Sequence, residues 1–401
     1  MREKFSRYLK DILADSYICY GRPGKIADGG RLIVAGGGIG ARDLLQDIPA
    51  LLSDSDYVMV CLADQVTQKS IYDSYPEAVD LTCLYAEGKD RHATYLQMAE
   101  LMIAPARNGK KVLAIFYGHP GLFASATHRA IAIARNEGIS AHMRPGISAL
   151  DYAIADLGFD PAFPGLGSFE ATDLLMRNRP LDPTVHNVIW QVGMVGEAGY
   201  RASGFDNKGL AQLKRHMLRY YPTDHVVTNY IGSSFAGTRP IMLPFALADL
   251  DTQEVAEQII AYSTLYVPPS IERPYDRNAC VEMGWVAEGQ SLPSADAYKT
   301  DLTYSDVNQS LLDASGVEFL TRTTNPSDEN PFYRLVDKLN ADPSFSDWYE
   351  THPEEAIWSM RLDISDEHKE VMVSTDFRRI EDALFQYDAH KSEVGKQPNR
   401  Y

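Results

Sequence analysis

The stretch IFYGHPGLFASATHRA, residues 115–130, has the pattern of a strand, a tight loop and a helix. The strand is expected to end at Gly118, and Ser125 or Thr127 is placed to cap the helix. Glycines on both sides of His119-Pro120 let the backbone approach a flat ligand closely. The loop contains no lysine, which argues against a phosphate ligand.

The side chains of this loop indicate how a ligand would be held. Leu122 and Phe123 offer apolar cover, while the loop amides can bind carbonyl or carboxylate groups. His119 is either a metal ligand or a residue that makes a hydrogen bond within the loop. No second histidine stands at ligand spacing, so the hydrogen bond is favoured.

Apolar runs before and after this stretch alternate with helical periods, which is typical of a largely parallel α/β sheet. The expected buried strands are RLIVAGGG (31–38), YVMVCLA (57–63), KVLAIFYG (111–118) and HNVIWQVG (186–193). The clearest helix is 92–109, because its apolar residues follow the 3.6-residue period and Asn108-Gly109 supplies a stop. A second α/β half is expected to include 226–234 and 262–269.

Two further loops resemble the first in character. AGGGIGARDLL (35–45) places Gly36, Gly38 and Ala41 in a G-x-G-x-x-A pattern directly after a strand. Asp64 lies 28 residues beyond Gly36, further than a dinucleotide site wants, so a tight turn and a ligand site remain equally good interpretations. With RPGISALD (144–151), three such loops with few cations favour a compact adenosine-type ligand over a pyrophosphate-bridged one.

Composition excludes several classes of protein. The chain has 401 residues, 45% of them hydrophobic, which is enough for more than one core. Its formal charge of -17 disfavours nucleic acid and anionic membranes as partners. Four separated cysteines without a C-x-x-C pair indicate neither a disulfide framework nor a thiolate metal site, and fit a reducing cytoplasm. No stretch has the roughly 18 apolar residues of a membrane span.

The two ends of the chain differ from this central region. Residues 1–30 are expected to form a helical extension, because Phe5 to Leu13 carry apolar residues at helical spacing. Residues 270–329 are largely polar and turn-rich, which predicts an extended connection. Asn330-Pro331 and the capping-box pattern THPE (351–354) bracket short amphipathic helices over 330–385. Residues 386–401 are expected to be a mobile tail.

Residues 31–269 resemble the S-adenosylmethionine-dependent tetrapyrrole methylase fold, with two α/β subdomains around a cofactor cleft. More closely, they resemble the borosin peptide α-N-methyltransferases, the family of the omphalotin precursor enzyme. The motifs that carry this resemblance are FYGHPGLFASATHRAIAIAR (116–135), MRPGISALDYAIADLGFDP (143–161), ATDLLMRNRPLDPTVHNVIWQVG (171–193) and STLYVPP (263–269).

The resemblance implies a set of site residues. The catalytic positions of the family's motif fall on Tyr85, Arg91, Tyr95 and Tyr117. The positions expected to contact S-adenosylmethionine are Gly36, Gly38, Tyr117, Gly118, His119, Leu122, Phe123, Ser148, Ala149 and Gln191. No metal is implied, because the sulfonium makes the methyl carbon electrophilic by itself.

The implied residues suit the chemistry. A peptide nitrogen is a poor nucleophile, so its methylation needs a base and a cation for the imidate oxygen. Arg91 and Tyr95 are four residues apart on one helical face, where the guanidinium would favour a phenolate. Tyr85, on the preceding loop, would join Arg91 and Tyr95 around the substrate amide. Without the resemblance, we would interpret Arg91 as a solvent-exposed helix residue and Tyr95 as a residue of the hydrophobic core.

The resemblance also implies an assembly. The connection at 270–329 corresponds to a clasp, and 330–385 resembles the helical leader domain of a precursor. A homodimer is expected, with a peptide acceptor that is either the chain's own tail, its partner's tail or a separate precursor. Two alternatives stay open: a tetrapyrrole C-methyltransferase, and a precursor-binding scaffold without turnover.

Overall fold

The computed structural model describes residues 26–201, 204–235, 237–292, 309–310, 312 and 330–391. The predicted N-terminal helix lies outside the described residues. So do residues 293–308, 311 and 313–329 of the predicted connection, and residues 392–401 of the predicted tail.

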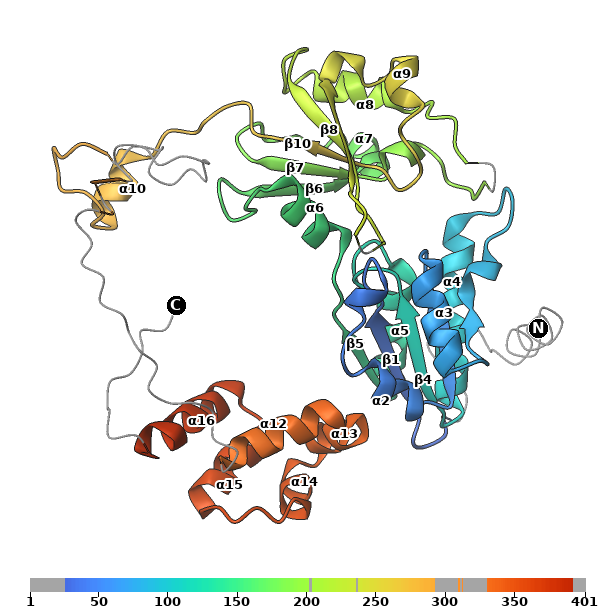
Figure 1. Cartoon of the computed structure of the whole chain (residues 1–401), viewed down its shortest axis with the longest axis vertical. Coiled ribbons are helices and arrows are strands. Elements are labelled where there is room, and N and C mark those ends of the chain that lie inside the picture. Colours follow the sequence, from blue (N-terminus) through green and yellow to red (C-terminus); the bar gives the residue numbers. More distant parts are fainter. Residues whose placement is uncertain are drawn as a thin grey trace.

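Two five-stranded sheets form the body of the chain (Figure 1). The first sheet has the order β3-β2-β4-β1-β5, and all of its strands are parallel. The second has the order β6-β7-β10-β8-β9, in which β6 and β7 are parallel and the remaining pairs are antiparallel. The strands are β1 (Arg31–Gly36), β2 (Tyr57–Cys61), β3 (Val79–Asp80), β4 (Lys111–Phe116), β5 (Ser140–Arg144), β6 (Leu166–Glu170), β7 (His186–Trp190), β8 (Val226–Ile231), β9 (Ile241–Ala246) and β10 (Thr264–Val267).

The predicted α/β class is confirmed, and each predicted strand exists but ends earlier than its apolar run. β1 stops at Gly36, because the chain turns where the Gly37 amide bonds to Phe116 O at 2.7 Å and Gly38 adopts a left-handed φ of 71°. The apolar residues beyond each strand belong to the loops that follow it.

Helices cover both faces of the first sheet. Leu32 and Val34 of β1 pack with α4 and α5, whereas Ile33 and Ala35 pack on the other face with α2 and α3. The strands are therefore buried on both sides, as their continuous apolar runs predict. The helices of the body are α2 (Ile48–Ser53), α3 (Gln65–Ser74), α4 (Arg91–Arg107), α5 (Ser125–Asn136), α6 (Ala149–Leu157), α7 (Ala171–Met176), α8 (Leu210–Met217) and α9 (Gln253–Ala256). A further helix, α10 (Arg277–Glu282), lies on the arm after β10, apart from the two sheets (Figure 1).

The helix boundaries confirm one prediction and correct another. α4 ends where expected, with Asn108 as its C-cap and Gly109 at a φ of 76°. The predicted side-chain cap of α5 is wrong, because Ala124 occupies the N-cap position. Thr127 instead turns its hydroxyl back to donate to Ala124 O at 2.7 Å and to Pro120 O, which ties the helix to the loop before it.

The three glycine-containing loops at the carboxyl ends of β1, β4 and β5 cross in close contact. A Cβ atom on Gly36 would lie 2.5 Å from Gly146 Cα and 2.6 Å from Gly118 O. A Cβ atom on Gly146 would meet Gly36 Cα at 2.6 Å. Glycine is therefore required here for backbone-to-backbone packing.

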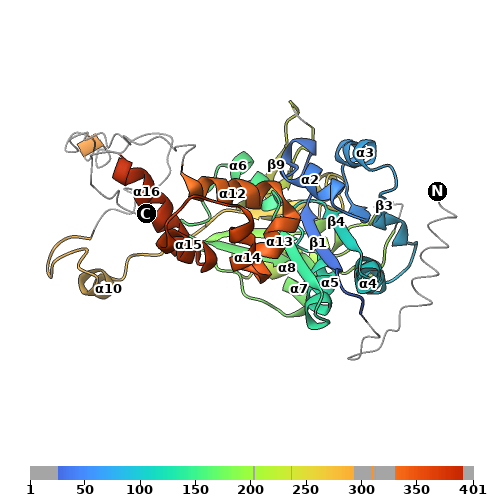
Figure 2. The same cartoon turned by 90° about the horizontal axis from the view of Figure 1, so that it is seen from below.

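A separate helical domain follows the body (Figures 1 and 2). It consists of α12 (Pro331–Ala341), α13 (Pro343–Thr351), α14 (Pro353–Ser359), α15 (Asp366–Val373) and α16 (Phe377–Lys391). Its own core includes Phe332, Leu335, Phe345, Ile357 and Met372.

The boundaries of the helical domain confirm one predicted cap and correct two other predictions. Asn330 caps α12 by accepting from the Phe332 amide at 3.0 Å, as predicted. The predicted capping box at THPE is wrong, because His352 is the N-cap of α14 and makes no side-chain cap bond. α16 also continues through residues 386–391, which the sequence assigned to the tail.

The glycine crossing predicts a stability loss from a single methyl group. Gly36→Ala should lower the free energy of unfolding by about 1–3 kcal/mol, because the added Cβ has no room between two backbones. Gly199→Ala is the matched control, since its nearest atoms would lie 3.7 Å away. Chemical denaturation of both variants checks this, and equal midpoints would contradict it.

Candidate functional site

A cavity of about 790 Å³ lies where the carboxyl ends of the first sheet face the second sheet. Cys61, Phe116 and the loops after them form one wall, and Trp190, Tyr230 and Thr264 form the other. Ligands in open α/β sheets bind at this end of the strands, so the cavity is the candidate site.

The structure brings most of the predicted site residues together around this cavity. The predicted residues that line it are Tyr85, Tyr95, Tyr117, Gly118, His119, Leu122, Phe123, Ser148, Ala149 and Gln191. Gly36 and Gly38 do not line it; they shape the first loop, and Ile39 supplies the contact instead. Asp64 reaches the cavity wall but also caps α3, accepting from the Thr67 amide at 2.7 Å.

The central loop has the geometry expected of a ligand-binding turn. His119 Nδ1 accepts a hydrogen bond from the Gly121 amide at 3.0 Å, which is the loop contact favoured from the sequence. Phe123 has a φ of 56°, and Gln191 opposite it has a φ of 58°. Such values are strained for residues with side chains and concentrate at functional sites. The Phe123 ring packs on Trp190 with centroids 5.4 Å apart, across the two sheets.

The second half of the body positions the predicted catalytic loop. Backbone hydrogen bonds join residues 87–91 to residues 198–200, including Gly88 N to Tyr200 O at 3.0 Å and Arg91 N to Ala198 O at 3.1 Å. Asp90 caps α4 by accepting from the His92 amide at 2.6 Å. The loop that carries Tyr85 and the start of α4 are therefore fixed from both sides.

The phenols of this loop are close together. The rings of Tyr85 and Tyr95 meet edge to face with centroids 6.5 Å apart, and Tyr200 packs on Tyr85 at 5.2 Å. Tyr200 was not foreseen in the sequence because it stands more than a hundred residues away on a loop without a recognisable motif.

The guanidinium of Arg91 is held in place by groups that the sequence could not identify. It donates to Glu197 O and lies 3.9 Å from Met194 Sδ. Burial raises the pKa of the Tyr85 phenol above its ordinary value, Tyr95 adds to this, and Arg91 opposes it more weakly. Burial therefore outweighs the effect of the cation, and Tyr85 is neutral.

Tyr117, at the end of β4, lies among acidic and phenolic groups. Partial burial raises its pKa to about 12, with further contributions from Tyr262 and Asp64. Nearby, Tyr152 donates to Asp43 at 2.8 Å and accepts from Arg42 at 3.0 Å. A cationic ligand would be favoured beside these groups.

A groove of about 620 Å³ adjoins the cavity. Tyr95, Phe123 and Gln191 line both, and Arg91 lies in the groove. The rest of the lining mixes small residues with polar ones such as His128, Glu170 and Glu197. The site therefore has an aromatic chamber and a passage with polar and charged side chains, and the two meet at the predicted catalytic residues.

Two kinds of feature are absent from the described residues. No group of three or more His, Cys, Asp or Glu residues in them is arranged to hold a metal ion. No helix in the described part of the chain is both long and apolar enough to cross a membrane.

Comparison with known proteins gives a family and several relatives. Residues 31–234 match the family of tetrapyrrole (corrin/porphyrin) methylases. The chain is 42% identical over 250 residues, 62% of its length, to a methyltransferase/ribosomally synthesized type I borosin cyclic peptide precursor of Cerrena unicolor. It is 42% identical over 257 residues, 64% of its length, to a protein of the same description from Mycena rosella. These matches span 61% and 64% of the two relatives.

Among solved structures, the chain is similar to a uroporphyrin-III-C-methyltransferase from Thermus thermophilus. The match covers 62% of this chain and 99% of that structure. The sequence identity is 17% and the TM-score is 0.43.

Proposed function

Because the chain belongs to the tetrapyrrole (corrin/porphyrin) methylase family, we propose that it is an S-adenosylmethionine-dependent methyltransferase whose acceptors are peptide backbone amides. The observation that carries the proposal is the meeting of Tyr85, Tyr95 and Arg91 where the cavity joins the groove. The names of its relatives, which describe borosin peptide precursors joined to methyltransferases, point to the same acceptor class.

The cavity suits S-adenosylmethionine, which supplies an electrophilic methyl group on a sulfonium. Its volume of about 790 Å³ lies in the range of small-molecule sites. Phe123, Leu122 and Trp190 offer faces for a flat base, and the left-handed backbone at Gly118 brings the loop to the cavity wall. Tyr117, close to Asp64, favours positive charge nearby.

The residues at the junction divide the acceptor chemistry. Tyr85 would take the amide proton as a phenolate, after its own proton has left to solvent; a positive charge in the cavity would favour that phenolate by lowering the raised pKa. Arg91, held by Glu197 O, would stabilise the negative charge that develops on the amide oxygen. Tyr95 would orient the phenol of Tyr85 through their edge-to-face contact.

The shape of the site favours an extended chain over a planar macrocycle. The groove continues from the cavity and offers carboxylates, histidines and Gln191 to a peptide backbone. A tetrapyrrole acceptor would need one broad opening and would have no use for a helical domain that resembles a precursor leader. A scaffold without turnover would bind the donor and transfer nothing.

The acceptor is proposed to be the chain's own tail, its partner's tail in a homodimer, or a separate peptide. Support for a second copy comes from the arm after β10, where Ile271, Met283 and Trp285 expose apolar side chains. Such side chains on an extended arm gain burial when another molecule covers them.

Replacement of Gly118 tests the donor site. Gly118→Val should weaken S-adenosylmethionine binding roughly tenfold or more, because a side chain would occupy the loop that faces the ligand. Gly138→Val is the matched control, since it also has a left-handed φ, 78° against 67°, and lies outside the cavity. Calorimetry on both folded variants checks this. Equal affinities would remove the loop from the site.

Replacement of the junction residues tests the reaction. Tyr85→Phe, Arg91→Ala and Tyr95→Phe should each keep donor affinity within a few-fold and lower methyl transfer by roughly 10²-fold or more. Intact-mass spectrometry after incubation with donor, followed by fragmentation, measures the methyl groups and locates them. Wild-type rates in any two variants would reject these roles, and methyl groups on side chains alone would reject the backbone amide.

The pH dependence identifies the base. Because burial raises the pKa of Tyr85, its phenolate is scarce near neutral pH and grows tenfold for each pH unit. The logarithm of the single-turnover rate should therefore rise with a slope of about 1 between roughly pH 7 and 9. In Tyr85→Phe the slope should vanish. A slope that survives in this variant would assign the proton to another group.

A further inference from the structure

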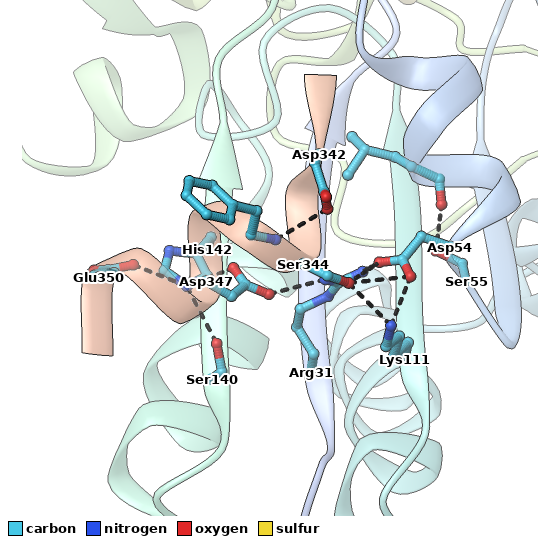
Figure 3. A network of polar contacts seen from close by, with 12 residues as sticks. Arg31, Asp54, Ser55, Lys111, Ser140, His142, Asp342, Ser344, Asp347 and Glu350 are labelled. Atoms are coloured by element: carbon cyan, nitrogen blue, oxygen red, sulfur yellow. Dashed lines mark hydrogen bonds and ion pairs between the residues drawn. The ribbon is translucent and has the colours of Figure 1, made fainter. Parts of the chain in front are cut away.

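The helical domain meets the body through one face of α13 (Figure 3). Ser344, Asp347 and Glu350 make these contacts, and they stand three residues apart in the sequence. Residues at this spacing line up on a single side of a helix. The stripe carries one hydroxyl and two carboxylates.

The surface that receives this stripe carries two cations, a histidine and the carboxylate of Asp54, which also accepts from Ser344 Oγ at 3.1 Å. Arg31 and Lys111 are the first residues of β1 and β4, and His142 lies on β5, the other neighbour of β1. Arg31 Nη1 donates to Asp347 at 2.8 Å, and Lys111 Nζ lies 3.1 Å from Ser344 Oγ. His142 Nε2 lies 3.7 Å from Asp347 and 3.5 Å from Glu350.

Arg31 links the two parts of the molecule. Its side chain is only 5% exposed, and its guanidinium also donates to Asp54 of the body at 2.5 Å. Burial alone would raise the pKa of Asp54, but Lys111, Arg31 and Ser344 outweigh it and hold the pKa below its ordinary value. Asp54 therefore stays ionised and keeps both cations in place to meet α13.

The contact is ionic rather than part of a shared core. The apolar residues of the helical domain pack on one another, and the described clusters of the body contain none of them. Polar contacts between domains of one chain resemble those of reversible complexes. Salt weakens such contacts when they lie near the surface.

From this juxtaposition we propose that the amino-terminal edge of the first sheet is a recognition site for an acidic helix, occupied in this chain by α13. The site lies at the opposite end of the strands from the cavity, because β1 begins at Arg31 and only the loop after its end at Gly36 reaches the cavity, through Ile39. Docking therefore holds the helical domain while leaving the cleft open. This proposal concerns docking and stands apart from methyl transfer.

Reactivity of Lys111 measures the docking in the full-length chain. Acetylation by an amine reagent, followed by mass spectrometry, reports how far α13 covers Lys111, while Lys69, 74% exposed, serves as an internal standard. Asp347→Arg would place a cation against Arg31 and should raise the relative rate at Lys111 roughly tenfold. Asp337→Arg, on an exposed position of α12, is the matched control and should change nothing.

A charge exchange tests the pairing itself. Glu350→Lys and His142→Glu should each raise Lys111 reactivity, by roughly 1.5- to 5-fold because this pair is partly exposed. The double variant should restore protection. Glu350 is 65% exposed, so these variants keep the measurement possible if Asp347→Arg fails to fold.

Several outcomes would overturn the proposal. They are unchanged Lys111 reactivity in folded Asp347→Arg, no rescue in the double variant, or no effect of raising salt from 0.05 to about 1 M. Protection that disappears on dilution would assign the helix to a second copy and overturn the assignment to the chain's own α13. Donor affinity should be unchanged in all variants, so a failed docking test and a failed methyltransferase test are distinguishable.

Discussion

The close crossing of three backbones is the constraint on which the site depends. Gly36, Gly118 and Gly146 come from loops after different strands, and their main chains meet at distances that leave no room for a Cβ atom on Gly36 or Gly146. This contact closes the carboxyl end of the first sheet. It also sets the positions of Tyr117, just before Gly118, and Ser148, two residues after Gly146, in the cavity wall. The cavity has this shape because the loops have glycine, which carries no side chain, where they cross.

The electrostatics of the site result from competition between burial and charge. Burial raises the pKa values of Tyr85 and Tyr117, which makes these phenols poor sources of phenolate by themselves. Arg91 opposes this only weakly at Tyr85, and its guanidinium donates to Glu197 O. A site of this kind suits a cationic cofactor, since a positive charge in the cavity would favour the phenolate that burial disfavours.

The two ends of the first sheet differ in chemistry. The carboxyl ends of its strands carry glycines and aromatic residues around a cavity, whereas the amino ends carry Arg31, Lys111 and His142 against an acidic helix. In a parallel sheet each end brings together residues from several distant segments of the chain. The chain can thus hold a helical domain at one end and keep the other free for a ligand.

The sequence by itself determined the elements and the loops that form the cavity wall. Continuous apolar runs identify β1, β2 and β4, and the glycine-containing turns after β1 and β4 were recognisable because strand, turn and helix signals are local. Helix caps were predicted less well. Asn330 caps α12 as expected, whereas the Thr127 hydroxyl donates to carbonyls that precede it in the chain. A hydroxyl has several possible hydrogen-bond partners nearby, and the local sequence does not decide between them.

Only the tertiary structure decided which distant groups meet. Tyr200 on Tyr85, Glu197 O on Arg91 and Asp347 on Arg31 are contacts between segments more than a hundred residues apart. No local pattern encodes such pairs, because they depend on how two sheets and a helical domain pack. The raised pKa of Tyr85 was likewise decided by the tertiary structure, since burial is a property of the folded chain rather than of the residue.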